Sequence, residues 1–432
     1  MEILSHNQPD FAARFTALLD RQRHDPAVEQ AAAAVLEQVR TGGDAAVAAL
    51  ARKFDGAELV PGHFTVAAAE IAAAAAKLSP AQRRAIAAAH RQIADFARRQ
   101  KRRDWDCRPH PGVRLGEKFV PLSRVGVYVP GGTAPLVSTV LHTATLAKVA
   151  GVKEIVLVTP PRTAGSVHPA VLYAAKVAGV TEVLKLGGVY AVGALAYGTA
   201  SIRPVEKIVG PGNAYVTEAK RQVYGRVALD LVAGPSEILV IADDTADPRF
   251  IAADLLSQAE HGSGREQAVF ITTCPEQIPA VRAELERQAA ALPRLECVRA
   301  VLDRGVALIA AADLAQAADL ANRIAPEHLE IMTRHPRRVA ARIEAAGAIF
   351  LGPWTPEPLG DFVAGPSHVL PTAGAGRFFS GLTLEHFYRR MSMLEYTEAA
   401  LRREEPWVAE FAAMEGLAAH GRSAGIRTGR SG

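Results

Sequence analysis

A repeated strand-and-helix pattern in residues 124–224 limits the folds that this chain of 432 residues can adopt. Short apolar runs rich in Val, Ile and Leu each end in Gly or Pro, and a helical segment follows each of them. The runs recur about every 25–30 residues, which is typical of strand–helix–strand units that build a parallel sheet. Ligands of such sheets bind at the carboxyl ends of the strands, where these Gly-rich turns lie. The four predicted strands are "RVGVYVPGG", "KEIVLVTPP", "TEVLKLGG" and "VEKIVGPGN".

A second α/β segment follows the first one along the chain. It holds the predicted strands "EILVIADD", "QAVFITT" and "GAIFLG", with a helix over residues 313–325. Residues 28–103 are Ala-rich and predict helices, because Ala has the highest helix propensity. The first 25 residues and the last 50 or so also read as helical. No G-x-G-x-x-G follows the first strand, so the usual dinucleotide-binding fingerprint is absent.

Composition excludes several classes of protein. The chain is 49% hydrophobic and 22% charged, which is typical of a globular protein with a sizeable core. It has no run of about 18 apolar residues and no signal-peptide pattern, so we expect no membrane span. The three cysteines are scattered, which argues against disulfides and thiolate zinc sites and suits a reducing cytoplasm. The basic run "ARRQKRRDWD" has no interleaved aromatic platform, so we interpret it as a solvated helix end and expect no nucleic-acid partner.

Polar residues at the ends of predicted elements suggest a metal site. Gln258 and His261 end a helix in "LLSQAEHGSGREQ", and at a spacing of three residues they share one helix face. A frayed polar helix end is the simpler interpretation of this pair. Further polar pairs stand at other element ends, and together they favour a His/Asp/Gln metal site beside an acid–base pair; they are Glu327 and His328, Asp361 and His368, and Glu415 and His420.

Seven motifs in this order and spacing resemble the histidinol dehydrogenase family. The resemblance extends from about Val35 to Arg427. It implies an NAD-dependent, zinc-dependent, four-electron oxidation of L-histidinol to L-histidine through L-histidinaldehyde, which completes histidine biosynthesis. The motifs are "VGVYVPGGTAPLVSTVL", "KIVGPGNAYVTEAKRQV", "AGPSEILVIAD", "DLLSQAEHG", "APEHLEI", "LGDFVAGPSHVLPT" and "EGLAAH".

The resemblance also implies residue roles. One Zn²⁺ per subunit would be held by Gln258, His261, Asp361 and His420, with His420 supplied by the partner in a homodimer with shared active sites. The adjacent Glu327 and His328 would be the acid–base residues. Zinc favours His nitrogen and carboxylate oxygen, and an amide oxygen is a weak ligand that suits an open site. Histidinol would contact Ser236, His328, His368, Glu415 and the four metal ligands.

The cofactor contacts are less regular. The resemblance implies that NAD contacts Tyr128 and Asn213, together with the Gln of a family "GGAQA" segment. This chain has "GGVYA", with Tyr190 at the Gln position, so NAD is either held differently or the site has drifted. His142 stands where relatives more often carry Met.

From the elements and the resemblance together we expect an α/β fold. Two parallel-sheet domains would be Rossmann-like but incomplete, and small helical arms at both ends would pack on the partner subunit. The predicted units are an N-terminal helical arm (1–25), a discontinuous large α/β domain with the metal and catalytic residues (26–123 and 240–380), an inserted NAD-binding domain (124–239) and a C-terminal helical arm that contributes to the partner's site (381–432).

Two alternative functions remain open from the sequence. A dehydrogenase of the same fold could oxidise another polar alcohol, although Glu415, His368 and His420 favour a substrate with an imidazole and an amine. A zinc hydrolase would also use a metal, a Glu and a His. Tyr128 and Asn213 in the parallel-sheet segment favour a dinucleotide partner instead.

Overall fold

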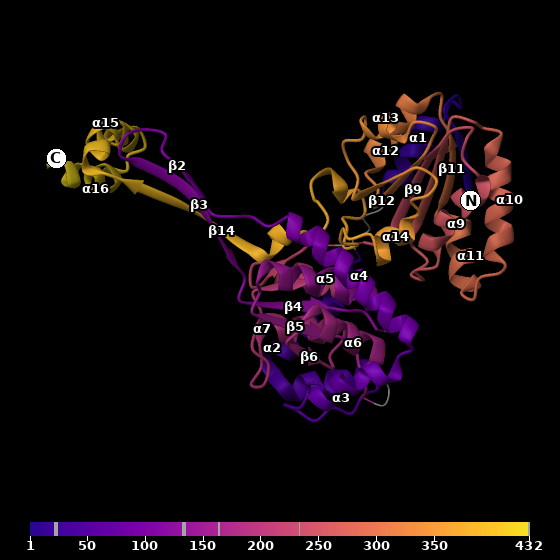
Figure 1. Ribbon diagram of the computed structural model, residues 1–432, viewed down its shortest axis with the longest axis horizontal. Helices are drawn as coiled ribbons and strands as arrows, with labels where there is room; N and C mark the ends of the chain where they lie inside the picture. The colour runs from indigo at the N-terminus through magenta and orange to yellow at the C-terminus, as the bar shows by residue number, and fades with distance from the viewer. Residues whose placement is uncertain (21–24, 132–134, 163–164, 233, 431–432) are drawn as a thin grey trace.

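The protein consists of two parallel α/β units and a projecting arm (Figure 1). The computed structural model describes residues 1–20, 25–131, 135–162, 165–232 and 234–430. The predicted α/β class with parallel sheets is confirmed. Within these ranges, no helix has the length and apolar character needed to cross a membrane.

The five-stranded sheet has the order β6-β5-β4-β7-β8, and all its strands are parallel. Each predicted strand of the first segment is present, and each is followed by its predicted helix. Residues 132–134, between β4 and α5, lie outside the described residues. The elements are β4 (Arg124–Tyr128), α5 (Val137–Ala150), β5 (Glu154–Val158), α6 (Pro169–Ala178), β6 (Glu182–Leu184), α7 (Gly188–Tyr197), β7 (Lys207–Val209), α8 (Ala214–Val223) and β8 (Ala228–Leu229).

Helices from the N-terminal part of the chain form an outer layer on both sides of this sheet. Helix α2 (Pro26–Asp55) packs on α7 and α8, while α4 (Pro80–Arg99) packs on α5 and α6, with α3 (Ala68–Ala73) and η1 (Ala74–Lys77) beside α6. The prediction that residues 26–123 belong with residues 240–380 is therefore wrong for the helices. Helices α5 and α6 bury one apolar face of the parallel sheet and α7 and α8 bury the other, and the Ala-rich N-terminal helices complete the core from outside these pairs.

The six-stranded sheet has the order β1-β11-β10-β9-β12-β13, again with all strands parallel. Two sets of helices enclose it, α9 to α11 on one face and α1, α12 and α13 on the other. The elements are β9 (Glu237–Ala242), α9 (Pro248–Ala259), β10 (Gln267–Thr272), α10 (Gln277–Ala289), α11 (Leu295–Arg304), β11 (Val306–Ala310), α12 (Leu314–Ile324), β12 (His328–Met332), α13 (Pro336–Ala340), β13 (Ala348–Leu351), α14 (Glu357–Phe362) and η2 (Ala375–Arg377).

The N-terminal segment is part of this unit and not a helical arm. Strand β1 (Glu2–Ser5) pairs in parallel with β11 at the sheet edge, and α1 (Phe11–Leu19) buries Phe15 completely. Residues 21–24 of the predicted arm lie outside the described residues. A four-residue strand is too short to show a period-two pattern, so its apolar residues were not distinguished from those of a helix.

The C-terminal segment begins with a strand, which corrects the prediction of a wholly helical arm. After η3 (Leu384–Phe387), β14 (Tyr388–Tyr396) pairs antiparallel with β3 (Val113–Pro121), and β2 (Trp105–Cys107) pairs with the other edge of β3. Helices α15 (Glu398–Met414) and α16 (Ala418–Thr428) pack together at the tip of this three-stranded sheet. Figure 1 shows that the arm carries them well away from both parallel sheets.

Candidate active site

The end of helix α9 supplies the first two predicted ligands. Gln258 lies in the last turn, fully buried, and its amide oxygen and nitrogen have no hydrogen-bond partner among the described residues. An unpartnered buried amide costs about 1–3 kcal/mol, so this side chain fits a metal ligand better than a core residue. His261 follows just beyond the helix, with its Nδ1 at 3.4 Å from the Ser236 hydroxyl.

The predicted acid–base pair lies at the amino end of β12. His328 Nδ1 is 2.9 Å from the Glu237 carbonyl oxygen, and the Glu237 N–H donates to Glu327 Oε2 at 2.9 Å. Both side chains are therefore held by the backbone of one residue on β9, although they are adjacent in the sequence. A carbonyl can only accept, so His328 Nδ1 carries a hydrogen and Nε2 is the nitrogen left for chemistry.

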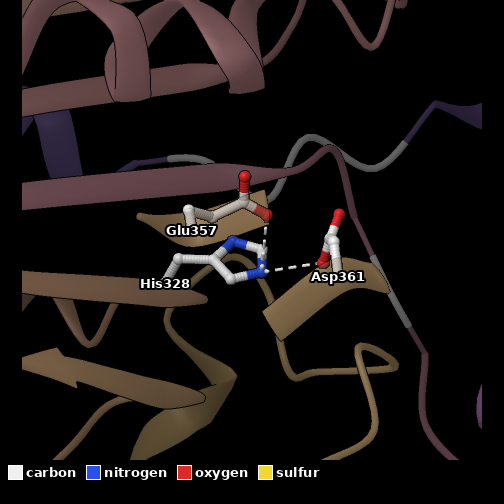
Figure 2. Close-up of side chains that lie close together, drawn as sticks. All are labelled: His328, Glu357 and Asp361. Atoms are coloured by element: carbon white, nitrogen blue, oxygen red, sulfur yellow. Dashed lines mark ion pairs between the residues drawn. The ribbon is translucent and has the colours of Figure 1, made fainter. Parts of the chain in front are cut away.

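His328 Nε2 faces two carboxylates of α14 (Figure 2). The distances to Glu357 Oε1 and to Asp361 Oδ1 are both 3.6 Å. Ligand atoms of these three residues all lie within 4.8 Å of one another, a spacing that could hold a metal ion. Glu357 was missed from the sequence, yet it precedes Asp361 by four residues in "TPEPLGDF", which places both on one helix face.

More buried carboxyl groups lie behind this cluster. Ser257 donates to Glu357 Oε2 at 3.0 Å, which joins the end of α9 to α14, and the Glu357 N–H donates to Glu330 Oε1 at 2.7 Å. Burial raises the pKa of Glu330, and the nearby Asp254 raises it further. Burial also raises the pKa of Asp254 and Glu357. Sequence spacing could have indicated both acids behind the site, because Glu330 follows His328 by two residues in a strand and Asp254 precedes Gln258 by one helical turn.

The pKa values of the acid–base pair are strongly shifted. Burial raises the pKa of Glu327 to about 8, against the opposing effects of His328 and the Glu237 N–H. Burial alone would lower the pKa of His328, but Glu327, Asp361 and Glu357 outweigh it and raise this pKa to about 10. For Asp361, the neighbouring histidines outweigh burial and lower the pKa. Such shifts are typical of functional sites.

His368 lies on the other side of Asp361. Its Nδ1 is 3.8 Å from Asp361 Oδ1, and its Nε2 is 3.2 Å from the Thr139 hydroxyl. The His142 ring stacks on it with centroids 4.6 Å apart at 24°. His142 is fully buried, and desolvation lowers its pKa to about 3, so it is a neutral packing partner for His368.

The residues expected to contact NAD lie at the carboxyl ends of the five-stranded sheet. The Gly188 N–H donates to the Tyr128 hydroxyl at 3.0 Å, and Asn213 caps α8 by accepting from the Val216 N–H at 3.0 Å. Tyr190 is fully buried, and its hydroxyl donates to Asp55 Oδ2 at the end of α2. Tyr190 therefore ties α7 to α2 in this structure.

Two predicted site residues are remote from the others in the same chain. Glu415 ends α15 and His420 lies in α16, both exposed at the tip of the arm. Figure 1 shows α16 far from α14, which carries Asp361. A single chain thus brings together the end of α9, the start of β12 and α14, and it leaves Glu415 and His420 outside this cluster.

Comparisons with known proteins agree on one family. Residues 19–428 match the family model described as histidinol dehydrogenase. The chain is 47% identical to histidinol dehydrogenase of Bacillus anthracis over 93% of both chains, and 46% identical to that of Cereibacter sphaeroides over 99% of both. A crystal structure of histidinol dehydrogenase from Elizabethkingia anophelis has a TM-score of 0.93 and 35% identity, over 99% of this chain and 98% of that one.

Proposed function

The chain belongs to the histidinol dehydrogenase family, and on this premise we propose that it oxidises L-histidinol to L-histidine through L-histidinaldehyde. Two NAD molecules would accept the two hydrides, one zinc ion per subunit would assist, and the reaction would take place in the cytoplasm. The observation that carries the proposal is the meeting of His328 and Asp361 beside the end of α9, where the buried amide of Gln258 has no partner among the described residues.

The side chains present fit a zinc ion. Gln258, His261 and Asp361 offer an amide oxygen, an imidazole nitrogen and a carboxylate oxygen, a donor set that suits Zn²⁺. The fourth ligand would be His420 of a second copy, since the arm carries α16 away from its own site. When bound, zinc supplies Lewis acidity and a template for the imidazole and amine of histidinol.

The protein's own groups would move the protons. In the first oxidation the neutral form of His328 takes the hydroxyl proton at Nε2, while the bond from Nδ1 to the Glu237 carbonyl fixes the tautomer. In the second, the ionised form of Glu327 takes a proton from the water that attacks the aldehyde, and the Glu237 N–H orients its carboxylate. The raised pKa values of both groups make these basic forms more abundant as pH rises, so the proposed proton transfers favour alkaline pH. Both side chains are buried, which limits the access of bulk water to the reactive aldehyde.

The substrate and the cofactor would be bound by residues of different parts of the protein. Ser236 and His368 would contact histidinol from this chain, and Glu415 would contact it from the partner. NAD would bind at the carboxyl ends of β4 and β7 through Tyr128 and Asn213. Because the Tyr128 hydroxyl accepts from Gly188, its own hydrogen stays available to the cofactor. Tyr190 would support this site through Asp55.

An NAD-reduction assay with purified protein, zinc and a panel of alcohols tests the reaction. We expect two NADH per histidinol consumed and histidine as the product. Turnover of another polar alcohol with none of histidinol would favour the alternative substrate. Release of a product by hydrolysis without NAD reduction would contradict the proposal altogether.

Subunit mixing tests the shared site. His261→Asn and His420→Asn should each be inactive alone. If the two residues meet across a homodimer, co-refolding them in equal amounts restores one intact site in each mixed dimer, or about a quarter of wild-type activity for random closed pairs. A mixture that stays inactive while forming mixed dimers would show that each chain builds its own site.

A further inference from the structure

A buried ion pair lies beneath the turn that follows strand β7. Lys220 lies on α8 and Asp230 directly follows β8, and their side chains are 3% and 1% exposed. Lys220 Nζ donates to Asp230 Oδ1 at 2.6 Å. The pair lies in the five-stranded unit and has no role in the proton transfers proposed above.

Both members of the pair bind the same glycine. Lys220 Nζ also donates to the Gly210 carbonyl oxygen at 2.9 Å, and the Gly210 N–H donates to Asp230 Oδ2 at 2.7 Å. The Leu231 N–H completes the set by donating to Asp230 Oδ1 at 2.7 Å. Both polar backbone groups of Gly210 are therefore fixed by charged partners, which form stronger hydrogen bonds than neutral ones.

Gly210 directly follows β7 and lies against the backbone of Tyr128 at the end of β4, so it brings together the two strand ends at which NAD is proposed to bind. It has a φ of +111°, and a Cβ built on it would lie 2.2 Å from the Tyr128 carbonyl oxygen. Three residues later, Asn213 begins α8. The position of Gly210 thus sets where the Asn213 side chain lies relative to Tyr128.

We propose that Lys220 and Asp230 are positioning residues for the dinucleotide, because they hold the Gly210–Asn213 turn against Tyr128. The inference rests on the proposed function. Burying an ion pair carries a desolvation cost that apolar side chains would avoid, so net stability is a weak reason for its presence. A turn fixed before the cofactor arrives loses less conformational entropy on binding, and that gain appears as affinity for the cofactor.

Lys220→Met tests the inference, because Met keeps the length of the side chain and removes its charge. We expect the KM for NAD to rise about tenfold while kcat and the KM for histidinol stay within about twofold, which is the signature of lost ground-state binding. Arg221→Met is the matched control: it removes the same charge from the next residue, which pairs with Glu29 and Glu218 on the surface. Its KM for NAD should not change.

Asp230→Asn approaches the same turn from the other side. Asn has nearly the same shape as Asp, so it leaves no cavity at position 230. This variant therefore tests the positioning role if Lys220→Met does not fold. We expect a similar rise in the KM for NAD. The double variant should show little more than the larger single effect, because residues that act through one shared partner are not additive.

The outcomes separate this inference from the proposed function. If the wild-type protein does not reduce NAD with histidinol, the proposed function fails. If it does, and folded variants keep the wild-type KM for NAD, the positioning role fails. A fall in kcat with no split between the two KM values, or loss of folding in both single variants, would show a structural pair only and would overturn the inference.

Discussion

The two parallel sheets differ in how they treat buried polar groups. In the five-stranded unit, buried charges are paired: Lys220 binds Asp230, and Arg124 binds both Glu154 and Glu182. In the six-stranded unit, atoms of Gln258, His328, Glu330 and Glu357 are buried without a hydrogen-bond partner in the part of the chain that the structure describes. In the five-stranded unit the same holds for Arg124 Nε and for the ring nitrogens of His142, which stacks on His368 of the site. Unpartnered buried groups are costly and rare, so they mark the place where function and not stability selected the side chains.

The two sheets also carry their proposed functional residues at opposite ends of their strands. The residues proposed for NAD follow β4 and β7, at the carboxyl ends where parallel sheets usually bind ligands. The residues proposed as acid and base precede or begin β12, and Ser236 precedes β9, at the amino ends. The rule for parallel sheets therefore locates only the proposed cofactor half of the site, and the half proposed to bind a metal depends on α9 and α14.

The largest effect is expected from removing a proposed metal ligand in the six-stranded unit, where buried polar groups lack partners. His261→Asn should lose bound zinc and lower activity by more than about a hundredfold, since even outer-shell changes at metal sites cost 10–100-fold. Zinc content by atomic absorption and the NADH assay measure the two effects. His63→Asn, on the exposed surface, is the control. A variant that keeps zinc and loses activity would contradict the ligand role.

His328→Asn should separate catalysis from metal binding. The Asn amide can still donate to the Glu237 carbonyl, while no nitrogen base remains. We expect turnover to fall by about 10²–10⁴-fold with zinc content unchanged. Release of zinc would instead make His328 a ligand, in line with its place beside Glu357 and Asp361.

Local patterns in the sequence were sufficient to predict most of the elements. Runs such as "KEIVLVTPP" and their following helices form as expected, because a buried parallel strand has an apolar signature independent of its partners. The pairing of β14 with β3 and of β1 with β11 joins segments far apart in sequence. No local pattern carries that information, so the arm and the N-terminal edge were predicted incorrectly.

The candidate site was predictable to the extent that its residues belong to motifs. Gln258, Asp361 and His328 belong to such motifs, and they lie on or beside α9, α14 and β12, which are close together in the structure. Glu330 and Glu357 do not stand out in sequence, because an acid becomes unusual only when it is buried. Tyr190 was expected to face the cofactor, but its hydroxyl is bound by Asp55, a partner 135 residues away.

Glu330→Gln tests the comparison between the two sheets by the free energy of unfolding. The pKa of Glu330 is raised by burial and by Asp254, so the folded wild-type protein loses stability as pH rises from about 4.3 through the folded pKa. Gln cannot ionise and escapes this loss. In chelator-treated protein, we expect urea unfolding to give the variant a free energy of unfolding about 1–3 kcal/mol above that of the wild type at pH 8. At pH 5 the difference should be much smaller.

The exposed Glu344→Gln is the control for this measurement and should show no such pH dependence. An equal stability difference at both pH values would mean that Glu330 binds no more protons in the folded than in the unfolded state over this range, so its carboxylate would be ionised in both states and its pKa would not be raised. The comparison between paired and unpaired sheets would then not extend to Glu330.

The smallest effect is expected on the paired side, at Tyr190. Tyr190→Phe keeps the buried ring and removes the hydroxyl that donates to Asp55, so the free energy of unfolding should fall by about 1–2 kcal/mol. The KM for NAD should stay within about twofold, because the hydroxyl is already engaged by the protein. Tyr224→Phe, at a largely exposed tyrosine, is the control for stability. A several-fold rise in the KM for NAD with unchanged stability would reverse the interpretation: Tyr190 would then contact the cofactor directly, as the family Gln is expected to, and Asp55 would be only its partner in the absence of NAD.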